Sequence, residues 1–370
     1  MPEFLLTMTE LERFLLFSRD AGITLMPTEP ANAQEMPKSL PLVKLSLLRP
    51  YAKALRDRGL DPEPVFLGVG LSEEATLDPD ASVHVMVATQ FVENAAEAAD
   101  DPFLAVRVAA GLDLEGWSIL ADAEARASTV GDYLSIFVST ANKVASSAVE
   151  YLHLNGPTAT LGERRTFEPS ILPAQNDAFM AGLGWAVLRR ALRDNLDPSQ
   201  IQVVVCEPKA LSPEFELMRP MKGDRSGFKL IFPSAWLSAP LEASTAPVSP
   251  SVVADRDIPE FVHSFRQVVR AHIAHGNLTA ADCARLVSMS QQKLQRLLAA
   301  EGTNISNEVG FVRQETARTL LSTTNRSIGE IAAALGYSDA ANFTRAFRRA
   351  HNQAPTTFRK AAQGLQRDAE

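Results

Sequence analysis

The sequence predicts an α+β N-terminal domain, with a small sheet flanked by helices, followed by an all-α C-terminal domain with two helix-turn-helix motifs. Three observations support this division. Residues 42–237 combine helical periodicity with short β-rich runs, residues 238–258 are rich in Ser, Ala and Pro, and residues 259–362 show helical periodicity throughout. We therefore expect two folded domains joined by a linker at 238–258, with an extension at 1–41 and a tail at 363–370.

The N-terminal domain is expected to contain helices and a small antiparallel or mixed sheet. Helical spacing extends over residues 42–59, 83–99, 128–147 and 175–195, and β-rich runs cover 201–206 and 228–232. Residues 149–154 and 158–161 alternate around Asn155-Gly156. This pattern predicts a hairpin, and we expect Pro157 to lengthen its turn.

The clearest signal in the C-terminal domain lies between Ser327 and Arg359. Ser327 and Glu330 form an S-x-x-E capping box, and apolar residues follow at helical spacing. Gly336 stands where a helix reverses through a left-handed residue, and Ser338 offers the N-cap of a second, basic helix. A short helix, a Gly-containing turn and a basic second helix are the parts that read the DNA major groove.

An earlier copy of this pattern covers residues 278–302. A shift of 49 positions aligns Leu286 with Leu335 and Arg296 with Arg345. The copy has its own capping box, N-cap and terminal glycine, at Thr279 with Asp282, Ser290 and Gly302. The repetition indicates two DNA-reading motifs rather than one.

The segment between the copies, residues 308–322, also has helical periodicity. Such a helix would be about 22 Å long. Two second helices on this connector can enter successive major-groove turns, which lie roughly 34 Å apart. A plain helical bundle is the alternative interpretation, but a bundle does not need basic second helices at equivalent places. We therefore expect this domain to bind double-stranded DNA.

The second motif resembles the AraC/XylS family of bacterial transcription regulators. The closing signature of that family, Gly-x-x-Pro-x-x-(Tyr/Phe)-Arg, is matched by Asn352, Pro355, Phe358 and Arg359. Asn352 replaces the usual Gly, and Asn also tolerates the left-handed conformation. The resemblance implies a double helix-turn-helix domain whose second helices contact promoter DNA.

The N-terminal region resembles the arabinose-binding-type domain of one AraC branch, and not a cupin barrel, over residues 70–109, 127–137 and 201–241. Because the resemblance begins near Leu40, we expect residues 1–35 to be a dispensable extension. The resemblance implies a ligand-responsive activator with a sensing and dimerisation domain. The partners it implies are promoter DNA, a small-molecule effector and a second copy of the chain, with RNA polymerase as a further candidate.

The expected DNA contacts lie on the outward faces of the two second helices, at positions that match those used by the family. In the first helix they are Ser290, Gln292, Lys293, Gln295 and Arg296, and in the second they are Ala340, Ala341, Thr344 and Arg345. Gln suits adenine and Arg suits guanine, whereas alanines can at most touch thymine methyl groups. The second half-site is therefore expected to be read more by shape and phosphates. The phosphate candidates are Arg348, Arg349 and Arg359, for which solvated surface arginines are the alternative.

The charge of the chain is divided between its two parts. Residues 255–370 hold 15 Lys or Arg and 11 Asp or Glu, whereas the remaining residues hold 21 and 33. A basic face is needed to neutralise the DNA phosphates, and the phosphates repel an acidic partner domain. This asymmetry supports DNA binding by the C-terminal domain.

Other classes of protein are disfavoured. The sequence contains no nucleotide-binding, zinc-protease or nucleophile motif, so we expect no enzyme, no cofactor and no metal site. It has no apolar run of about 18 residues and no basic signal-peptide start, so we expect neither a membrane span nor secretion. Cys206 and Cys283 offer no disulfide framework, which favours a reducing cytoplasm.

Two alternatives to an effector-responsive regulator stay open. In one, the N-terminal domain only dimerises or recruits a protein partner. In the other, it is an enzyme fused to a DNA-binding module, and the lack of a catalytic constellation counts against this. If the linker at 238–258 is correct, residues 255–370 should fold alone and bind DNA as a monomer.

Overall fold

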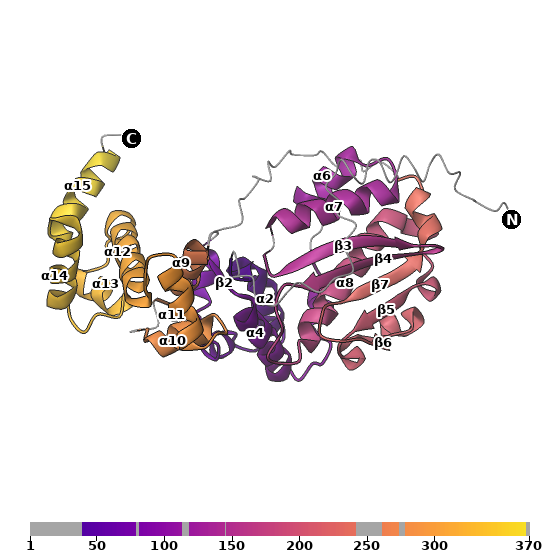
Figure 1. Ribbon diagram of the computed structural model, residues 1–370, viewed down its shortest axis with the longest axis horizontal. Coiled ribbons are helices and arrows are strands. Elements are labelled where there is room, and N and C mark those ends of the chain that lie inside the picture. The colour runs from indigo at the N-terminus through magenta and orange to yellow at the C-terminus, as the bar shows by residue number, and fades with distance from the viewer. Residues whose placement is uncertain are drawn as a thin grey trace. The chain divides into compact units, whose positions relative to one another are not determined.

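The computed structural model describes residues 39–78, 81–112, 118–144, 146–241, 261–273 and 278–367. By their contacts, these residues form two compact units. The N-terminal unit comprises residues 48–65 and 88–241, and the C-terminal unit comprises 39–47, 66–87 and 261–367. Apart from residues 39–41 and 238–241, the expected extension and linker lie outside the described residues. Figure 1 labels most of the elements named below.

The N-terminal unit contains a five-stranded mixed sheet in the order β3-β4-β7-β5-β6. Its strands are β3 (Ala148–Asn155), β4 (Thr158–Arg165), β5 (Gln202–Val205), β6 (Met221–Lys222) and β7 (Lys229–Pro233). The pair β5–β6 is parallel, and the other neighbours are antiparallel. The expected β-rich runs at 201–206 and 228–232 are thus strands, and the sheet lies beside the helices of the same unit (Figure 1).

The expected hairpin is formed by β3 and β4, with Asn155 opposite Thr158. Its loop therefore has two residues, Gly156 and Pro157, so the expectation that Pro157 lengthens the turn is wrong. The backbone of Gly156 has φ +58°, the left-handed region in which Gly has no steric cost. Pro157, which follows, fits the short turn because the fixed φ of proline is compatible with the second loop position.

One face of the sheet is buried under helices α7 (Val130–Val144) and α8 (Ala174–Leu192), which confirm the helices expected at 128–147 and 175–195. Two glycines let α8 lie close on both sides. A Cβ at Gly182 would stand 2.9 Å from the Cβ of Ala109, and a Cβ at Gly184 would stand 3.0 Å from Cδ1 of Leu230. Because residues two apart lie on opposite sides of a helix, α8 packs between α5 (Leu104–Ala110) and the sheet.

Four further helices lie among the described residues before position 130. They are α2 (Arg49–Arg56), α3 (Glu63–Leu67), α4 (Val85–Ala98) and α6 (Ser118–Arg126). Short 3-10 helices cover Leu45–Leu48, Glu74–Leu77, Arg193–Asn195, Pro198–Gln200, Pro208–Ala210, Pro213–Met218 and Ser234–Ser238. The helix expected at 42–59 differs from the structure at its start, because residues 42–44 form strand β1 (Leu42–Lys44).

Strand β1 pairs antiparallel with β2 (Ser82–His84), with Leu42 opposite His84. This two-stranded sheet belongs to the C-terminal unit, where β2 packs against helix α9 (Phe261–His272). Leu40 and Leu42 share a core with Phe265 and other residues of the C-terminal helices. The sequence boundaries place these two leucines in the extension and the N-terminal domain, whereas their contacts place them with the C-terminal helices.

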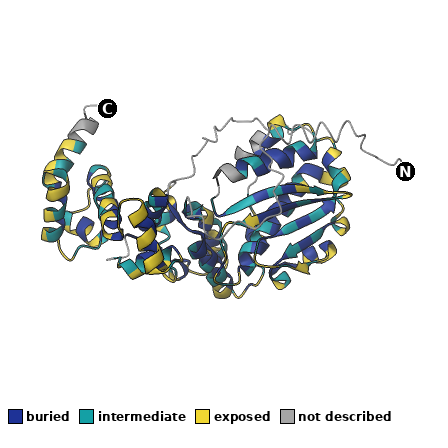
Figure 2. Ribbon diagram, in the orientation of Figure 1, coloured by how far each residue is buried: buried dark blue, intermediate teal, exposed yellow. Residues whose placement is uncertain are grey.

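The C-terminal unit is otherwise helical, and Figure 2 shows its buried residues on the inner faces of the helices. After α9 come α10 (Ala280–Leu286), α11 (Gln291–Ala300), α12 (Ile305–Thr323), α13 (Ile328–Ala334), α14 (Ala340–His351) and α15 (Pro355–Arg367). Its core includes Leu294 and Leu298 of α11 and Phe343 and Phe347 of α14, all with 0% exposure. Both expected second helices are therefore present, and each is anchored in the core by these apolar side chains.

Candidate nucleic-acid interface

The first helix-turn-helix consists of α10 and α11. The hydroxyl of Thr279 accepts the backbone amide of Asp282, and the Asp282 carboxylate accepts the amide of Thr279, which confirms the expected capping box. The chain then turns through Ser288, whose φ is +52°. Ser290 caps α11 by accepting the amide of Lys293 at 3.2 Å, as expected.

The second helix-turn-helix consists of α13 and α14. Ser327 and Glu330 form the expected capping box, and Gly336 reverses the chain with φ +71°. The N-cap of α14 is Asp339, which accepts the amide of Asn342 at 2.6 Å. The expected N-cap, Ser338, is therefore wrong by one residue, and its hydroxyl donates to the Asp339 carboxylate instead.

The turn of the second motif is one residue longer than the turn of the first. The left-handed residues Ser288 and Gly336 are 48 positions apart, whereas the N-caps Ser290 and Asp339 are 49 apart. Val287, which ends α10 and is buried, is consequently the structural match of Leu335. The alignment of Leu286 with Leu335 is wrong for this reason, and the alignment of Arg296 with Arg345 is correct.

The expected contact residues of α11 all lie on its exposed face. Every one of them is exposed: Ser290, Gln292, Lys293, Gln295 and Arg296. The opposite face is buried through Leu294, Leu297 and Leu298. A helix with one buried apolar side and a polar side of amides and cations can present hydrogen-bond donors to base edges.

The expected contact residues of α14 are placed less uniformly. Ala341, Arg345, Arg348 and Arg349 are exposed, whereas Ala340 and Thr344 are half-buried. The hydroxyl of Thr344 donates to the carbonyl oxygen of Ala340 at 2.7 Å, so its proton is already used within the helix. The basic character of this face therefore comes from its arginines.

Arg359 is turned inward. It is half-buried, and its Nη2 donates to the carbonyl oxygen of Arg326 at 2.6 Å. This bond ties α15 to the loop before α13. The backbone of Asn352, at the start of the same closing signature, is left-handed with φ +56°, as its place in the signature predicts.

Helix α12 connects the two motifs and contacts both of them. It has 19 residues, which corresponds to a length of about 28 Å, longer than the expected connector. Asn304 caps it, and near its start the buried carboxylate of Glu308 accepts Nε of Arg266 on α9 at 2.5 Å. The charge pair and the shared core hold the connector in place between the motifs.

The caps leave carboxylates at the N-terminal ends of α10, α13 and α14. The hydroxyl of Thr279 lowers the pKa of Asp282, and backbone hydrogen bonds from Ser327 and Asn342 lower the pKa values of Glu330 and Asp339. These groups are therefore ionised near neutral pH, and their negative charges interact favourably with the positive ends of the helix dipoles.

Two family profiles match the chain. The "Helix-turn-helix domain" profile covers residues 283–361, from α10 to α15, and the "Arabinose-binding domain of AraC transcription regulator, N-term" profile covers residues 59–241. The chain belongs to the AraC family of transcription regulators. The resemblance expected from the closing signature and from the non-cupin N-terminal domain is thereby confirmed.

Individual relatives of this AraC-family chain match parts of it. The transcriptional activator NphR of Rhodococcus sp. is 27% identical over 134 residues, which are 36% of this chain and 40% of that protein. The ornithine utilization regulator of Pseudomonas aeruginosa is 37% identical over 78 residues, which are 21% of this chain and 23% of that protein. The matched parts thus span less than half the length of these relatives.

A solved structure also resembles this AraC-family chain. The crystal structure of the transcriptional regulator CdpR from Pseudomonas aeruginosa is 20% identical, covers 85% of this chain and 98% of that one, and has a TM-score of 0.40. In the chain itself, no described helix is long and apolar enough to cross a membrane.

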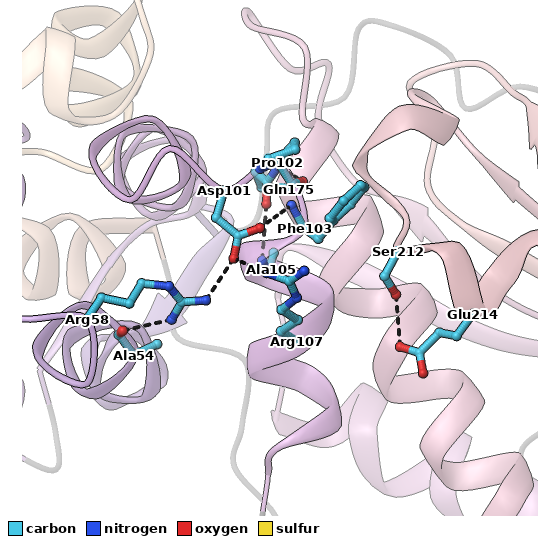
Figure 3. Close-up of polar contacts among 10 residues, drawn as sticks. All are labelled: Ala54, Arg58, Asp101, Pro102, Phe103, Ala105, Arg107, Gln175, Ser212 and Glu214. Carbon is cyan, nitrogen blue, oxygen red and sulfur yellow. Dashed lines mark hydrogen bonds and ion pairs between the residues drawn. The ribbon is translucent and has the colours of Figure 1, made fainter.

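The arabinose-binding-type unit also contains two polar clusters that the sequence did not reveal. In the first, Asp101 accepts hydrogen bonds from Arg58 and Arg107, both at 2.7 Å (Figure 3). Next to Asp101, the side-chain Nε2 of Gln175 donates to the carbonyl oxygen of Pro102, and its Oε1 accepts a hydrogen bond from the backbone amide of Ala105. Because Arg58 follows α2 and Gln175 starts α8, the cluster joins three helical segments that are distant in sequence.

The second cluster lies on the buried face of the sheet. Glu150 and Glu163 are opposite each other on β3 and β4, and the guanidinium of Arg165 contacts Glu163 and Asp177 of α8. Burial raises the pKa of Glu163 to about 7 and raises the pKa of Glu150 well above its usual value. Among the described residues, no group of His, Cys, Asp and Glu side chains is placed to hold a metal ion.

Proposed function

We propose that this chain is a sequence-specific DNA-binding transcription regulator that reads two successive major-groove segments with α11 and α14. The observation that carries the proposal is the pair of capped helix-turn-helix motifs on one connector, α12, each with an exposed polar face on its second helix. A connector of about 28 Å is comparable with the roughly 34 Å that separates successive major-groove turns.

In the proposed complex, α11 reads the first half-site. Gln292 and Gln295 suit adenine and Arg296 suits guanine, because each of these pairings makes two hydrogen bonds at the base edge. Ser290 and Lys293 lie at the same end of the helix and are exposed. Lys293 carries a compact positive charge without the planar fork of arginine, so we assign it to phosphate oxygens.

Helix α14 contributes differently to the proposed complex. Ala340 and Ala341 can contact only apolar groups such as the thymine methyl, which leaves Arg345 as the base-reading side chain. Arg348 and Arg349 lie exposed on the later turns of the helix, where phosphates are the expected partners. Thr344 and Arg359 have the least support as contacts, because both donate hydrogen bonds within the protein.

The N-terminal unit, in this proposal, binds a small-molecule effector and forms a homodimer, and the regulator acts as an activator in the cytoplasm with RNA polymerase as a further partner. The arabinose-binding-type profile over residues 59–241 supports an effector, and the matched relative named as an activator supports that sign of regulation. Dimerisation would raise affinity at paired sites through effective concentration.

Selection from a random DNA library with the full chain tests the DNA-binding proposal. We expect an enriched motif with two blocks of preferred bases about one helical turn apart. Retention of DNA without any sequence preference would contradict it. Thermal shift against a metabolite library tests the effector, because a ligand that binds only the folded state raises the melting temperature. A melting temperature that no compound in the library changes would favour an N-terminal unit that only dimerises or recruits a partner.

A further inference from the structure

The N-terminal end of α14 carries a chain of hydrogen bonds from its N-cap to its base-reading arginine. The Asp339 carboxylate accepts the backbone amide of Asn342 at 2.6 Å through Oδ1 and the side-chain Nδ2 of Asn342 at 2.7 Å through Oδ2. Oγ of Ser338 accepts Nδ2 as well, at 2.6 Å. On its other side, Oδ1 of Asn342 accepts Nη2 of Arg345.

The chemistry of these groups fixes the orientation of the Asn342 amide. An ionised carboxylate only accepts hydrogen bonds and a guanidinium only donates them. Nδ2 must therefore face Asp339 and Oδ1 must face Arg345, since a flipped amide would oppose donor to donor and acceptor to acceptor. Asn342 is half-buried, whereas Arg345 is exposed, so the more enclosed residue supports the more exposed one.

The equivalent helix of the first motif, α11, lacks this arrangement. The residues 49 positions earlier are Ser290, Lys293 and Arg296. Ser290 caps the amide of Lys293, but an ammonium cannot accept a hydrogen bond and repels the guanidinium one turn further on. Within the described part of the chain, no group accepts a hydrogen bond from the Arg296 side chain.

The geometry points to Asn342 as a positioning residue that determines specificity at the second half-site, by holding Arg345 toward one guanine. The inference rests on the proposed function, that α14 reads DNA. An arginine loses rotamer freedom when it is fixed, and a hydrogen bond that already holds it in the free protein removes part of that loss from binding. One of its five N–H donors is used by Asn342, and four stay available for a bidentate contact with guanine O6 and N7.

The same bonds prevent Asn342 from reading a base itself. Both hydrogens of Nδ2 are directed to Asp339 and Ser338, and Oδ1 accepts from Arg345. Asparagine on a recognition helix commonly pairs with adenine, and this pairing needs a free amide edge. The second half-site should therefore show a guanine that depends on two protein residues and no adenine that depends on Asn342.

The test measures binding of the full chain to its selected site, with each of the four base pairs placed in turn at every position of the second half-site. The variants are Asn342→Ala, Arg345→Ala and the double variant. The matched control is Lys293→Ala, at the equivalent position of α11. We expect Asn342→Ala to lower the guanine preference at one base pair by roughly five- to tenfold, within the range of a bidentate contact.

Arg345→Ala should abolish that preference at the same base pair, and Asn342→Ala should cause no further loss of preference in the Arg345→Ala background, since Asn342 acts only through the arginine. Lys293→Ala should weaken binding to all sequences alike. Asn342→Asp separates positioning from folding. Its carboxylate still accepts from Arg345 but cannot donate to Asp339, so the melting temperature should fall while the guanine preference stays.

Two results would overturn the inference alone: an unchanged guanine preference in Asn342→Ala, or a further loss of preference when Asn342→Ala is added to Arg345→Ala. If the parent chain shows no guanine preference that depends on Arg345, the proposed function of α14 is contradicted. The inference then fails with it.

Discussion

The backbone amide of Leu40 donates a hydrogen bond to Oγ of Ser264, 224 residues further along the chain, at 3.0 Å. Both residues have 0% exposure, and the same hydroxyl donates to the carbonyl oxygen of Phe261 at 2.8 Å. The C-terminal unit is therefore completed by residues that precede the N-terminal sheet. A fragment that begins at residue 255 lacks these residues, so its autonomous folding no longer follows from the composition of the linker.

This relationship gives the first prediction. Leu40→Ala should lower the free energy of unfolding of the C-terminal unit by about 2–5 kcal/mol, because it leaves a cavity in the core around α9. Leu47→Ala makes the same chemical change at a side chain that is 49% exposed, and it should cost much less. Hydrogen exchange of α9 amides in the full chain measures both. Equal protection of α9 in the two variants would show that Leu40 does not support this helix.

The second prediction concerns base reading by α11. Arg296→Ala should cost about 1–3 kcal/mol of specific binding and relax the preference at one base pair of the first half-site, because a bidentate contact with guanine is lost. Competition with sites mutated at each position measures the effect. An unchanged preference at every position would remove Arg296 from the set of base-reading residues.

The third prediction concerns the phosphates. Arg348→Ala should weaken binding to all sequences and reduce the slope of log affinity against log salt by roughly one, because one fewer counterion is released. Fluorescence anisotropy over a range of salt concentrations measures the slope. If the loss is confined to a single base position, Arg348 reads a base and its assigned role is reversed.

The fourth prediction follows from the buried carboxylates of the N-terminal unit. Burial raises the pKa of Glu163 from 4.5 in the unfolded chain to about 7 in the fold, opposed by Arg165 and reinforced by Asp177, with Glu150 opposite on β3. A carboxyl group with a raised pKa favours the fold when protonated. Its contribution is therefore greatest below about pH 4.5 and is lost as the pH rises through about 7.

Glu163→Gln keeps the shape of this side chain without its charge. It should stabilise the N-terminal unit at pH 8, on the order of 1–3 kcal/mol, and the gain should shrink as the pH falls toward 5. Glu168→Gln, at an exposed position of the same unit, is the control. Denaturant unfolding followed through tryptophan fluorescence checks this, since Trp185 and Trp236 lie in the N-terminal unit. A gain that is independent of pH would show that the raised pKa of Glu163 does not cause it.

The sequence predicted the local features of the fold better than its long-range ones. The capping box of Ser327 and Glu330 and the reversals at Gly336 and Asn352 follow from neighbouring residues, so they can be read directly. Strand β1 was predicted as helix because its partner, β2, lies about 40 residues away and leaves no local trace. The assignment of Leu40 to the core of the C-terminal unit was missed for the same reason.

The candidate interface was predicted at the level of helix faces and missed at the level of side-chain partners. The periodicity of α11 and α14 assigned Gln292, Arg296 and Arg345 to the outer side, where the structure places them. The bond from Arg345 to Asn342 depends on rotamers that spacing alone does not determine. The N-cap of α14 is Asp339, which lies 49 residues after Ser290, whereas the N-caps of the first helices, Thr279 and Ser327, are 48 residues apart, and a uniform 49-residue shift does not show this difference.

Methylation interference on the selected DNA site is the sharpest test of DNA reading by α11 and α14, because a methyl group on guanine N7 blocks the major-groove edge that arginine reads. We expect interference at guanines in two blocks about one helical turn apart, with the first block lost in Arg296→Ala and the second in Arg345→Ala. Interference in a single block, or in two blocks that neither variant alters, would contradict a regulator that reads DNA with both α11 and α14.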